Sequence, residues 1–272
     1  MRDFNLKIYS SLLNELKSSS FEFYPYKEFY AQNPGSQAVV LRHDVDARKE
    51  NSLAFAKIQH AMGIRGTYYF RMIPASYDET IIREMNEMGH EIGYHYETMD
   101  SSKGDIEKAY NEFCRHLESF RKLVPVSTIC MHGSPLSKFD NRAIWSKYDY
   151  RKLGIVAEPY FDLDFNKVFY ITDTGRRWNG ASVSIRDKAM AENPCTNEAF
   201  KKLNYRSTFD IIKSIKNNTF PSVVMMTFHP QRWTDNKSQW YQELLLQNTK
   251  NIVKSVLVKL KQHKGNQHFS VK

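Results

Sequence analysis

Cysteine is scarce in this chain of 272 residues. The three cysteines, Cys114, Cys130 and Cys195, are far apart in the sequence, and no Cys-x-x-Cys pair occurs. This pattern argues against a cysteine-based zinc site. So few cysteines are also typical of proteins from a reducing compartment. We therefore expect a cytoplasmic protein.

Long hydrophobic runs are also missing. No stretch approaches the ~18 consecutive apolar residues that indicate a membrane helix, so we expect no membrane span. The N-terminal apolar residues are spaced like one face of an amphipathic helix, and no small-residue cleavage site follows them. Apolar residues still make up 41% of the chain and aromatic residues 14%, enough for a sizeable core. We expect one domain over residues 1–272, with an N-terminal helix within 1–20.

Phosphate-binding loops are absent as well, because neither a Gly-x-Gly-x-x-Gly nor a Walker-type sequence occurs. The net charge is nevertheless +9, which favours an anionic partner. The basic residues are spread along the chain, and their densest stretch belongs to a predicted helix at 238–263. We therefore expect no nucleic-acid partner, whereas a substrate that carries phosphate would suit the charge.

Strand and helix patterns alternate along the chain. Short apolar runs predict strands at 38–41, 67–70, 91–95, 127–131, 167–171 and 222–227. Helical periodicity predicts helices at 48–62, 78–88, 104–122, 207–217 and 238–263. This alternation indicates a mostly parallel sheet covered by helices. Closed on itself it would be a (β/α) barrel of about seven strands; an open doubly wound sheet is the structural alternative.

Polar residues gather directly after the predicted strands. These residues are Asp44 and Asp46, His95 and Glu97, His132, Asp173, and His229. Active sites of α/β folds form at this carboxyl edge of the sheet. Two carboxylates on one side of an extended chain repel each other unless a cation is present, and neutral imidazole is a common metal ligand. The pattern therefore predicts a metal-assisted hydrolytic site.

Structural roles are the alternative for each of these residues taken alone. Asp46 could cap the helix that follows it, with Asp44 hydrogen-bonded nearby. His95 could be a buried, hydrogen-bonded histidine, and His132 and His229 could be ordinary loop residues. All of these side chains converging on one face would be much harder to explain in this way.

Three segments carry a resemblance to a known family. Residues 38–46, 63–70 and 89–95, the last reading Gly-His-Glu-Ile-Gly-Tyr-His, resemble the polysaccharide deacetylase superfamily, which is carbohydrate esterase family four and its relatives. The resemblance covers roughly residues 38–230. It implies a distorted (β/α)7 barrel and a divalent metal, with zinc the most common. It also implies hydrolysis of acetamides on amino sugars of a polysaccharide or its precursor.

The resemblance also implies roles for individual residues. Asp44 corresponds to the general base, Asp46 and His95 to metal ligands, and His229 to the general acid. Asp173 would orient catalytic groups, and Trp178 would line the sugar site. Aromatic side chains could stack on the apolar faces of a sugar, and as candidates we take Tyr94, Trp178 and Trp233.

The chain departs from the family at Met99. The family has a second metal histidine at this position, four residues after the first, and methionine is a poor ligand for a hard metal. The third ligand must then come from elsewhere, and Glu97 and His132 are equally good candidates, with Asp100 another. Two other functions remain open: hydrolysis of another small C–N bond, as in allantoinase-like relatives, and glycan binding without a metal. A cytoplasmic sugar precursor linked to a nucleotide or a lipid is the substrate we expect.

Overall fold

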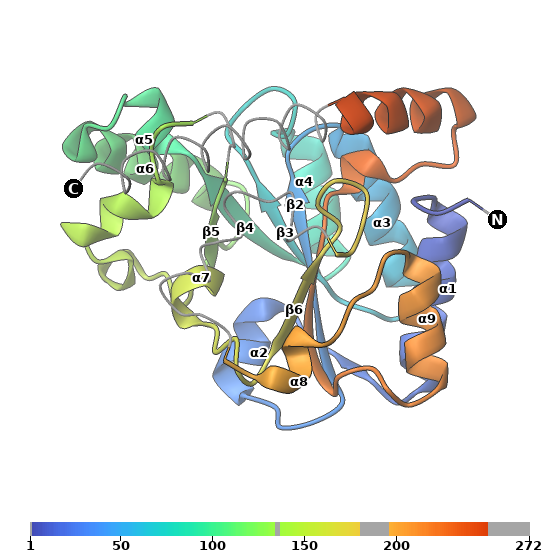
Figure 1. The fold of residues 1–272 in the computed structure, drawn as a ribbon. Helices are drawn as coiled ribbons and strands as arrows, with labels where there is room; N and C mark the ends of the chain where they lie inside the picture. Colours follow the sequence, from blue (N-terminus) through green and yellow to red (C-terminus); the bar gives the residue numbers. More distant parts are fainter. Residues whose placement is uncertain (1, 134–136, 180–195, 250–272) are drawn as a thin grey trace, which may run out of the picture.

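A computed structural model describes residues 2–133, 137–179 and 196–249. Its centre is a parallel sheet with the strand order β5-β4-β3-β2-β7-β6 (Figure 1). The strands are β2 (Ala38–Val45), β3 (Thr67–Phe70), β4 (Glu91–Tyr96), β5 (Ile129–Met131), β6 (Phe169–Thr172) and β7 (Val223–Phe228). A further short strand, β1 (Glu22–Phe23), pairs with the beginning of β2. All six predicted strands are therefore present.

The sheet is a half-barrel. Within the described residues β5 and β6 form its two ends, because neither pairs with the other. Single bridges extend these ends, from Thr128 to Ala157 and from Thr172 to Asn179. The distorted (β/α) barrel that the sequence predicts is therefore confirmed, in an open form.

The longer helices pack on one face of the sheet, and two short helices, around Tyr26 and Tyr160, lie against the other face (Figure 1). The longer helices are α1 (Leu6–Ser18), α3 (Lys49–Ala61), α4 (Glu79–Glu87), α6 (Ile106–Arg121) and α9 (Thr208–Lys216). The shorter ones are α2 (Tyr26–Gln32), α5 (Thr98–Ser101), α7 (Pro159–Asp162), α8 (Glu198–Lys201) and three 3-10 helices, η1 (Asn141–Ser146), η2 (Tyr150–Leu153) and η5 (Pro230–Arg232). Residues 237–249 are helical, and the remainder of the helix predicted at 238–263 lies outside the described residues.

Alternation along β2 produces two core layers. Val39 and Leu41 pack with the outer helices, whereas Ala38 and Val40 face the concave side together with Tyr26 of α2. Successive side chains of a strand point to opposite faces, so a strand buried on both faces is apolar throughout. The sequence of β2 changes from apolar to polar only at Arg42, where the strand approaches the carboxyl edge.

Side-chain caps mark where several helices begin. Asp78 accepts from the backbone of Thr80 and Ile81 at the start of α4. Asp105 does the same for α6, and Ser207 forms a capping box at α9. These caps satisfy N–H groups that have no partner within the helix. They explain why the predicted beginnings at 78, 104 and 207 lie within two residues of the observed ones.

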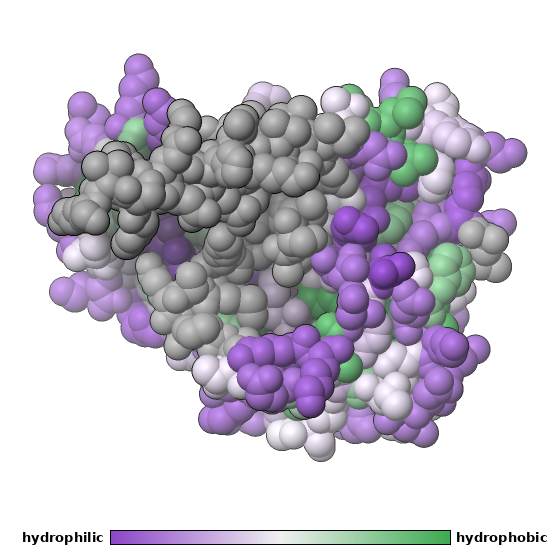
Figure 2. Space-filling model, viewed as in Figure 1, coloured by the Kyte–Doolittle hydropathy of each residue, from purple (hydrophilic) through white to green (hydrophobic). Residues whose placement is uncertain are grey.

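The described surface is mixed in polarity. Figure 2 shows hydrophilic residues over most of the visible described face, with an apolar area on the helix at 237–249. That helix exposes the side chains of Tyr241, Leu245 and Leu246. No helix among the described residues is long and apolar enough to cross a membrane.

Candidate metal and catalytic site

The carboxyl edge of the sheet brings the predicted site residues together. Asp44 lies in β2 and Asp46 directly after it, His95 lies in β4, and His132 follows β5. Asp173 follows β6 and His229 follows β7. Parallel strands end at the same edge, so residues up to 185 positions apart in the sequence meet there.

Asp46, His95 and His132 form a group of potential metal ligands. Their donor atoms all lie within 4.8 Å of one another. Asp46 Oδ1 is 3.6 Å from His95 Nε2 and 3.6 Å from His132 Nε2. Two ligands that are each about 2.1 Å from a tetrahedral zinc ion would be about 3.4 Å apart. Asp46 Oδ1 is also buried without a hydrogen-bond partner. This donor set therefore fits a divalent metal.

His95 is held in the form that can bind a metal. Its Nδ1 donates a hydrogen bond to the carbonyl of Cys130, 2.9 Å away on the neighbouring strand. The proton on Nδ1 leaves the lone pair on Nε2, the atom that faces Asp46. Burial lowers the pKa of His95 to about 4, so the ring is neutral at pH 7.

The Nδ1 of His132 faces a carboxylate rather than the backbone carbonyl that His95 faces. This Nδ1 is 2.9 Å from Glu97 Oε2, and both oxygens of Glu97 accept hydrogen bonds from Arg71. Burial opposes ionisation of Glu97, but His132 and Arg71 outweigh it and lower the pKa of Glu97 to about 2. Glu97 is thus an ionised carboxylate behind His132, and it does not belong to the group of donor atoms around Asp46.

Position 99 contributes nothing to this group. The Met99 side chain is buried in the core, and its backbone N–H donates to Asn141 Oδ1. The predicted alternative for Asp46, a cap of the following helix, is wrong: α3 begins after Arg48, with no side-chain cap. The carboxylate of Asp46 instead faces His95, His132 and His229.

Asp44 is paired with Arg42, two residues earlier in the same strand. Arg42 Nε and Nη2 donate to the two oxygens of Asp44, each at 2.8 Å. Burial would raise the pKa of Asp44, but the guanidinium overcomes this and lowers it. A second group of donor atoms, Asp44, His95 and Cys130, also exists. It suits a cation poorly, because the positive charge of Arg42 occupies both carboxylate oxygens.

His229 and Asp173 form a dyad opposite the ligand group. Asp173 Oδ1 accepts from His229 Nδ1 at 2.6 Å, which leaves Nε2 facing Asp46 Oδ2 at 3.9 Å. Asp173 is fully buried and also accepts from Arg232 and from the indole N–H of Trp233. These positive and donor groups overcome the effect of burial and lower the pKa of Asp173.

The three aromatic residues predicted to bind sugar are buried, although Tyr94 also lines a pocket. Trp233 is fully buried, Trp178 is 4% exposed and Tyr94 is 1% exposed. The indole N–H of Trp178 donates to Thr208, and the hydroxyl of Tyr94 contacts His116. Trp178 and Trp233 pack against each other, and Tyr94 packs on Phe113. Aromatic residues after strands carry no signal that separates core packing from ligand binding.

Sequence reasoning missed the arginines of the site. Arg42 lies on the same side of β2 as Asp44, which strand alternation could have indicated. Arg71 directly follows β3, the same position relative to its strand that drew attention to the histidines. Gln231, whose side chain donates to Asp46 Oδ2 at 3.1 Å, follows the His-Pro sequence without any signal of its own.

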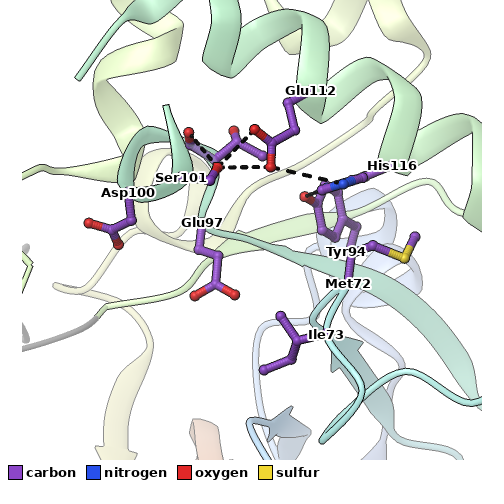
Figure 3. A pocket seen from close by; sticks show the side chains of 9 residues that line it. Met72, Ile73, Tyr94, Glu97, Asp100, Ser101, Glu112 and His116 are labelled. Atoms are coloured by element: carbon purple, nitrogen blue, oxygen red, sulfur yellow. Dashed lines mark hydrogen bonds and ion pairs between the residues drawn. The ribbon is translucent and has the colours of Figure 1, made fainter. Parts of the chain in front are cut away.

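A pocket of about 130 Å³ lies beside Tyr94 and Glu97. Figure 3 shows Glu97 on its wall, with Met72 and Ile73 on one side and Glu112 and His116 of α6 on another. Glu97 thus both lines the pocket and contacts His132. The lining includes acidic and apolar side chains but no lysine or arginine.

Comparisons with known proteins identify similar solved structures. No family model and no curated protein matches the chain. One similar structure is a family four carbohydrate esterase, PdaA from Bacillus subtilis, with 12% identity and a TM-score of 0.40 over 88% of this chain and 84% of that one. Another is the CE4 domain of a multidomain xylanase from a Trinervitermes trinervoides hindgut metagenome, with 13% identity and a TM-score of 0.38 over 81% and 83%.

A third structure is a mutant of a CE4 family pseudoenzyme with restored enzymatic activity. It is 12% identical with a TM-score of 0.41, and the match covers 80% of this chain but only 63% of that one. Likeness at this level says nothing about activity.

Proposed function

We propose that this protein is a metal-dependent hydrolase that removes an acyl group, such as acetyl, from the nitrogen of an amino sugar. The observation that carries the proposal is the arrangement of two units around Asp46. On one side is the donor group of Asp46, His95 and His132. On the other is the His229–Asp173 dyad, whose free nitrogen points at the same carboxylate.

A bound divalent cation, for which we propose zinc, would supply Lewis acidity to the acyl carbonyl and to the attacking water. Asp46, His95 and His132 would hold it. We propose Glu97 as a support of His132 rather than as a ligand, because its two oxygens are already engaged by Arg71. The unpaired Oδ1 of Asp46 argues against a chain that has lost its metal.

Asp44 is the proposed general base. Arg42 keeps it ionised, and its Oδ2 lies 3.8 Å from His95 Nε2, at the edge of the donor group. A carboxylate in this position can take a proton from the attacking water. His229 is the proposed general acid. Asp173 accepts from its Nδ1, and in the imidazolium form of the ring the second proton, on Nε2, would be the one given to the departing amine.

The proposed substrate is an N-acylated amino sugar within a glycan or a glycan precursor, in the cytoplasm. The net charge of +9 would favour a precursor that carries phosphate. The described cysteines, Cys114 and Cys130, are free thiols, which agrees with a reducing compartment. Hydrolysis of a ureide is the competing activity, because the same groups would act on another small C–N bond.

Metal content and substrate preference together test the proposal. Elemental analysis should find about one divalent ion per chain in the native protein and much less in His95→Ala. His116→Ala is the matched control, because His116 lies outside the donor group. The native protein should release acetate from N-acetylated amino sugars faster than it cleaves ureides. Equal metal in His95→Ala and the native protein, or cleavage of ureides alone, would contradict the proposal.

A further inference from the structure

The loop that carries His132 is held by hydrogen bonds to its backbone. The N–H of His132 donates to the carbonyl of Tyr96, and its carbonyl accepts from Asn141 Nδ2, both at 2.8 Å. The same Asn141 accepts from the N–H of Met99. Asn141 therefore ties the backbone of His132 to helix α5, which contains Met99.

These hydrogen bonds hold the backbone of His132 but do not set the orientation of its ring, which depends on a side-chain partner. That partner is Glu97, whose Oε2 is 2.9 Å from His132 Nδ1. The contact is an ion-pair distance rather than an aligned hydrogen bond, and because a carboxylate accepts protons in such contacts but donates none, it favours a proton on Nδ1 over one on Nε2. The lone pair then lies on Nε2, the atom 3.6 Å from Asp46 Oδ1.

Arg71 connects this support to a second ligand. Its Nε and Nη2 donate to the two oxygens of Glu97, at 3.0 and 2.6 Å, and its Nη1 donates to the backbone carbonyl of Asp46 at 3.2 Å. A planar guanidinium bound to both oxygens of a carboxylate fixes its orientation. One side chain thus sets the positions of both Asp46 and the carboxylate behind His132.

From these contacts we infer that Arg71 and Glu97 are a positioning pair that makes His132 the third metal ligand in place of a residue at position 99. The inference rests on the metal site of the proposed function. The two histidine ligands then obtain the same tautomer from different acceptors: a backbone carbonyl for His95 and the carboxylate of Glu97 for His132. Partners of this kind typically raise metal affinity about 10–100-fold.

Zinc affinity of the apoprotein, measured by competition with a chromogenic chelator, tests the pair. Glu97→Ala and Arg71→Met should each bind zinc about 10–100-fold more weakly than the native protein. Glu112→Ala is the matched control, since Glu112 lines the same pocket without contacting His132, and it should keep native affinity. His132→Ala should lose at least as much affinity as either variant.

Cobalt substitution separates positioning from direct ligation. Arg71→Met and Glu97→Ala, saturated with Co²⁺, should keep the native visible spectrum, because the three ligands are still present. His132→Ala should change it. Native zinc affinity in both Glu97→Ala and Arg71→Met would overturn the inference and leave the proposed function standing. A spectrum altered by Glu97→Ala but not by His132→Ala would also overturn it, because Glu97 would then be the ligand. No zinc binding by the native protein would instead overturn the proposed function.

Discussion

Asp173 holds His229 by two atoms at once: its Oδ1 accepts from the ring Nδ1 at 2.6 Å, and its Oδ2 accepts from the backbone N–H at 3.0 Å. The ring therefore has both its tautomer and its direction set by one buried carboxylate. Arg232 and Trp233 also donate to this carboxylate, but Asp173 itself holds the ring of His229.

Replacing this carboxylate by an amide should disrupt the dyad. In Asp173→Asn one carboxylate oxygen becomes an NH₂ group, which cannot accept a hydrogen bond. We expect kcat on an N-acetyl substrate to fall by about 10²-fold or more, while the metal content stays native because Asp173 is outside the donor group. Steady-state kinetics with elemental analysis check this, and an unchanged kcat would remove Asp173 from the mechanism.

Removing the imidazole of His229 should slow the hydrolysis of amides more than that of activated esters. An amine leaves poorly unless it is protonated, whereas the leaving group of an activated ester needs no proton. His229→Ala should therefore keep its metal, lose about 10²–10⁴-fold in turnover of an N-acetyl substrate, and lose much less on an activated acetate ester. Equal losses on both substrates would indicate that His229 orients the substrate or stabilises negative charge instead.

Asp44 should be separable from the metal ligands. In Asp44→Asn the side chain keeps its shape but can no longer take a proton. We expect native metal content and a fall in turnover of about 10²–10⁴-fold. Asp46→Asn is the matched comparison and should lose metal. The opposite result, with metal lost from Asp44→Asn and kept in Asp46→Asn, would exchange the two roles.

Arg42 should determine the pH below which kcat/KM falls. Its guanidinium lowers the pKa of Asp44, so the base stays ionised as the pH falls. In Arg42→Gln this charge is lost and the pKa of Asp44 should rise, which moves the acidic limb of the kcat/KM profile to higher pH. Arg42→Lys keeps a positive charge and should show a smaller displacement. A limb that does not move in Arg42→Gln would mean that Asp44 is not the group that titrates there.

His43 should make the fold sensitive to acid. Its Nδ1 donates to the carbonyl of Thr67, and burial lowers its pKa to about 3. Unfolded, the ring has a pKa of about 6.5, so below that pH the unfolded state binds a proton that the folded state does not. The free energy of unfolding should therefore fall with decreasing pH between about 6.5 and 3, by up to about 1.4 kcal/mol per pH unit from this residue.

Urea unfolding of the native protein and His43→Gln at several pH values measures this effect. The variant should lose part of the slope between pH 6.5 and 4.5. Tyr9→Phe is the control, because it removes a hydroxyl that contacts the His43 ring but leaves the titrating group in place. It should lower stability with little change in slope. The same slope in His43→Gln as in the native protein would show that His43 does not contribute.

Much of the fold follows from local patterns. The segments 38–41 and 67–70 are apolar and β-branched or aromatic, and Gly35 and Gly66 precede them. Helix beginnings follow from caps such as Asp78, which act over three residues. Strand β1 and helix α2, in contrast, have weak patterns, and they form because Phe23 and Tyr26 find partners supplied by distant parts of the chain.

The sequence by itself determined which residues would reach the carboxyl edge, because strand ends can be read from a chain and parallel strands end together. Only the tertiary structure decided which of them share a contact. Glu97 and His132 were equal candidates as ligands, and Arg71, more than 20 positions from both, separates them by occupying the carboxylate. The burial of Trp178 and Trp233 was likewise decided by packing against each other. Such contacts depend on distances between elements, and those distances are set by the whole core and not by any one segment.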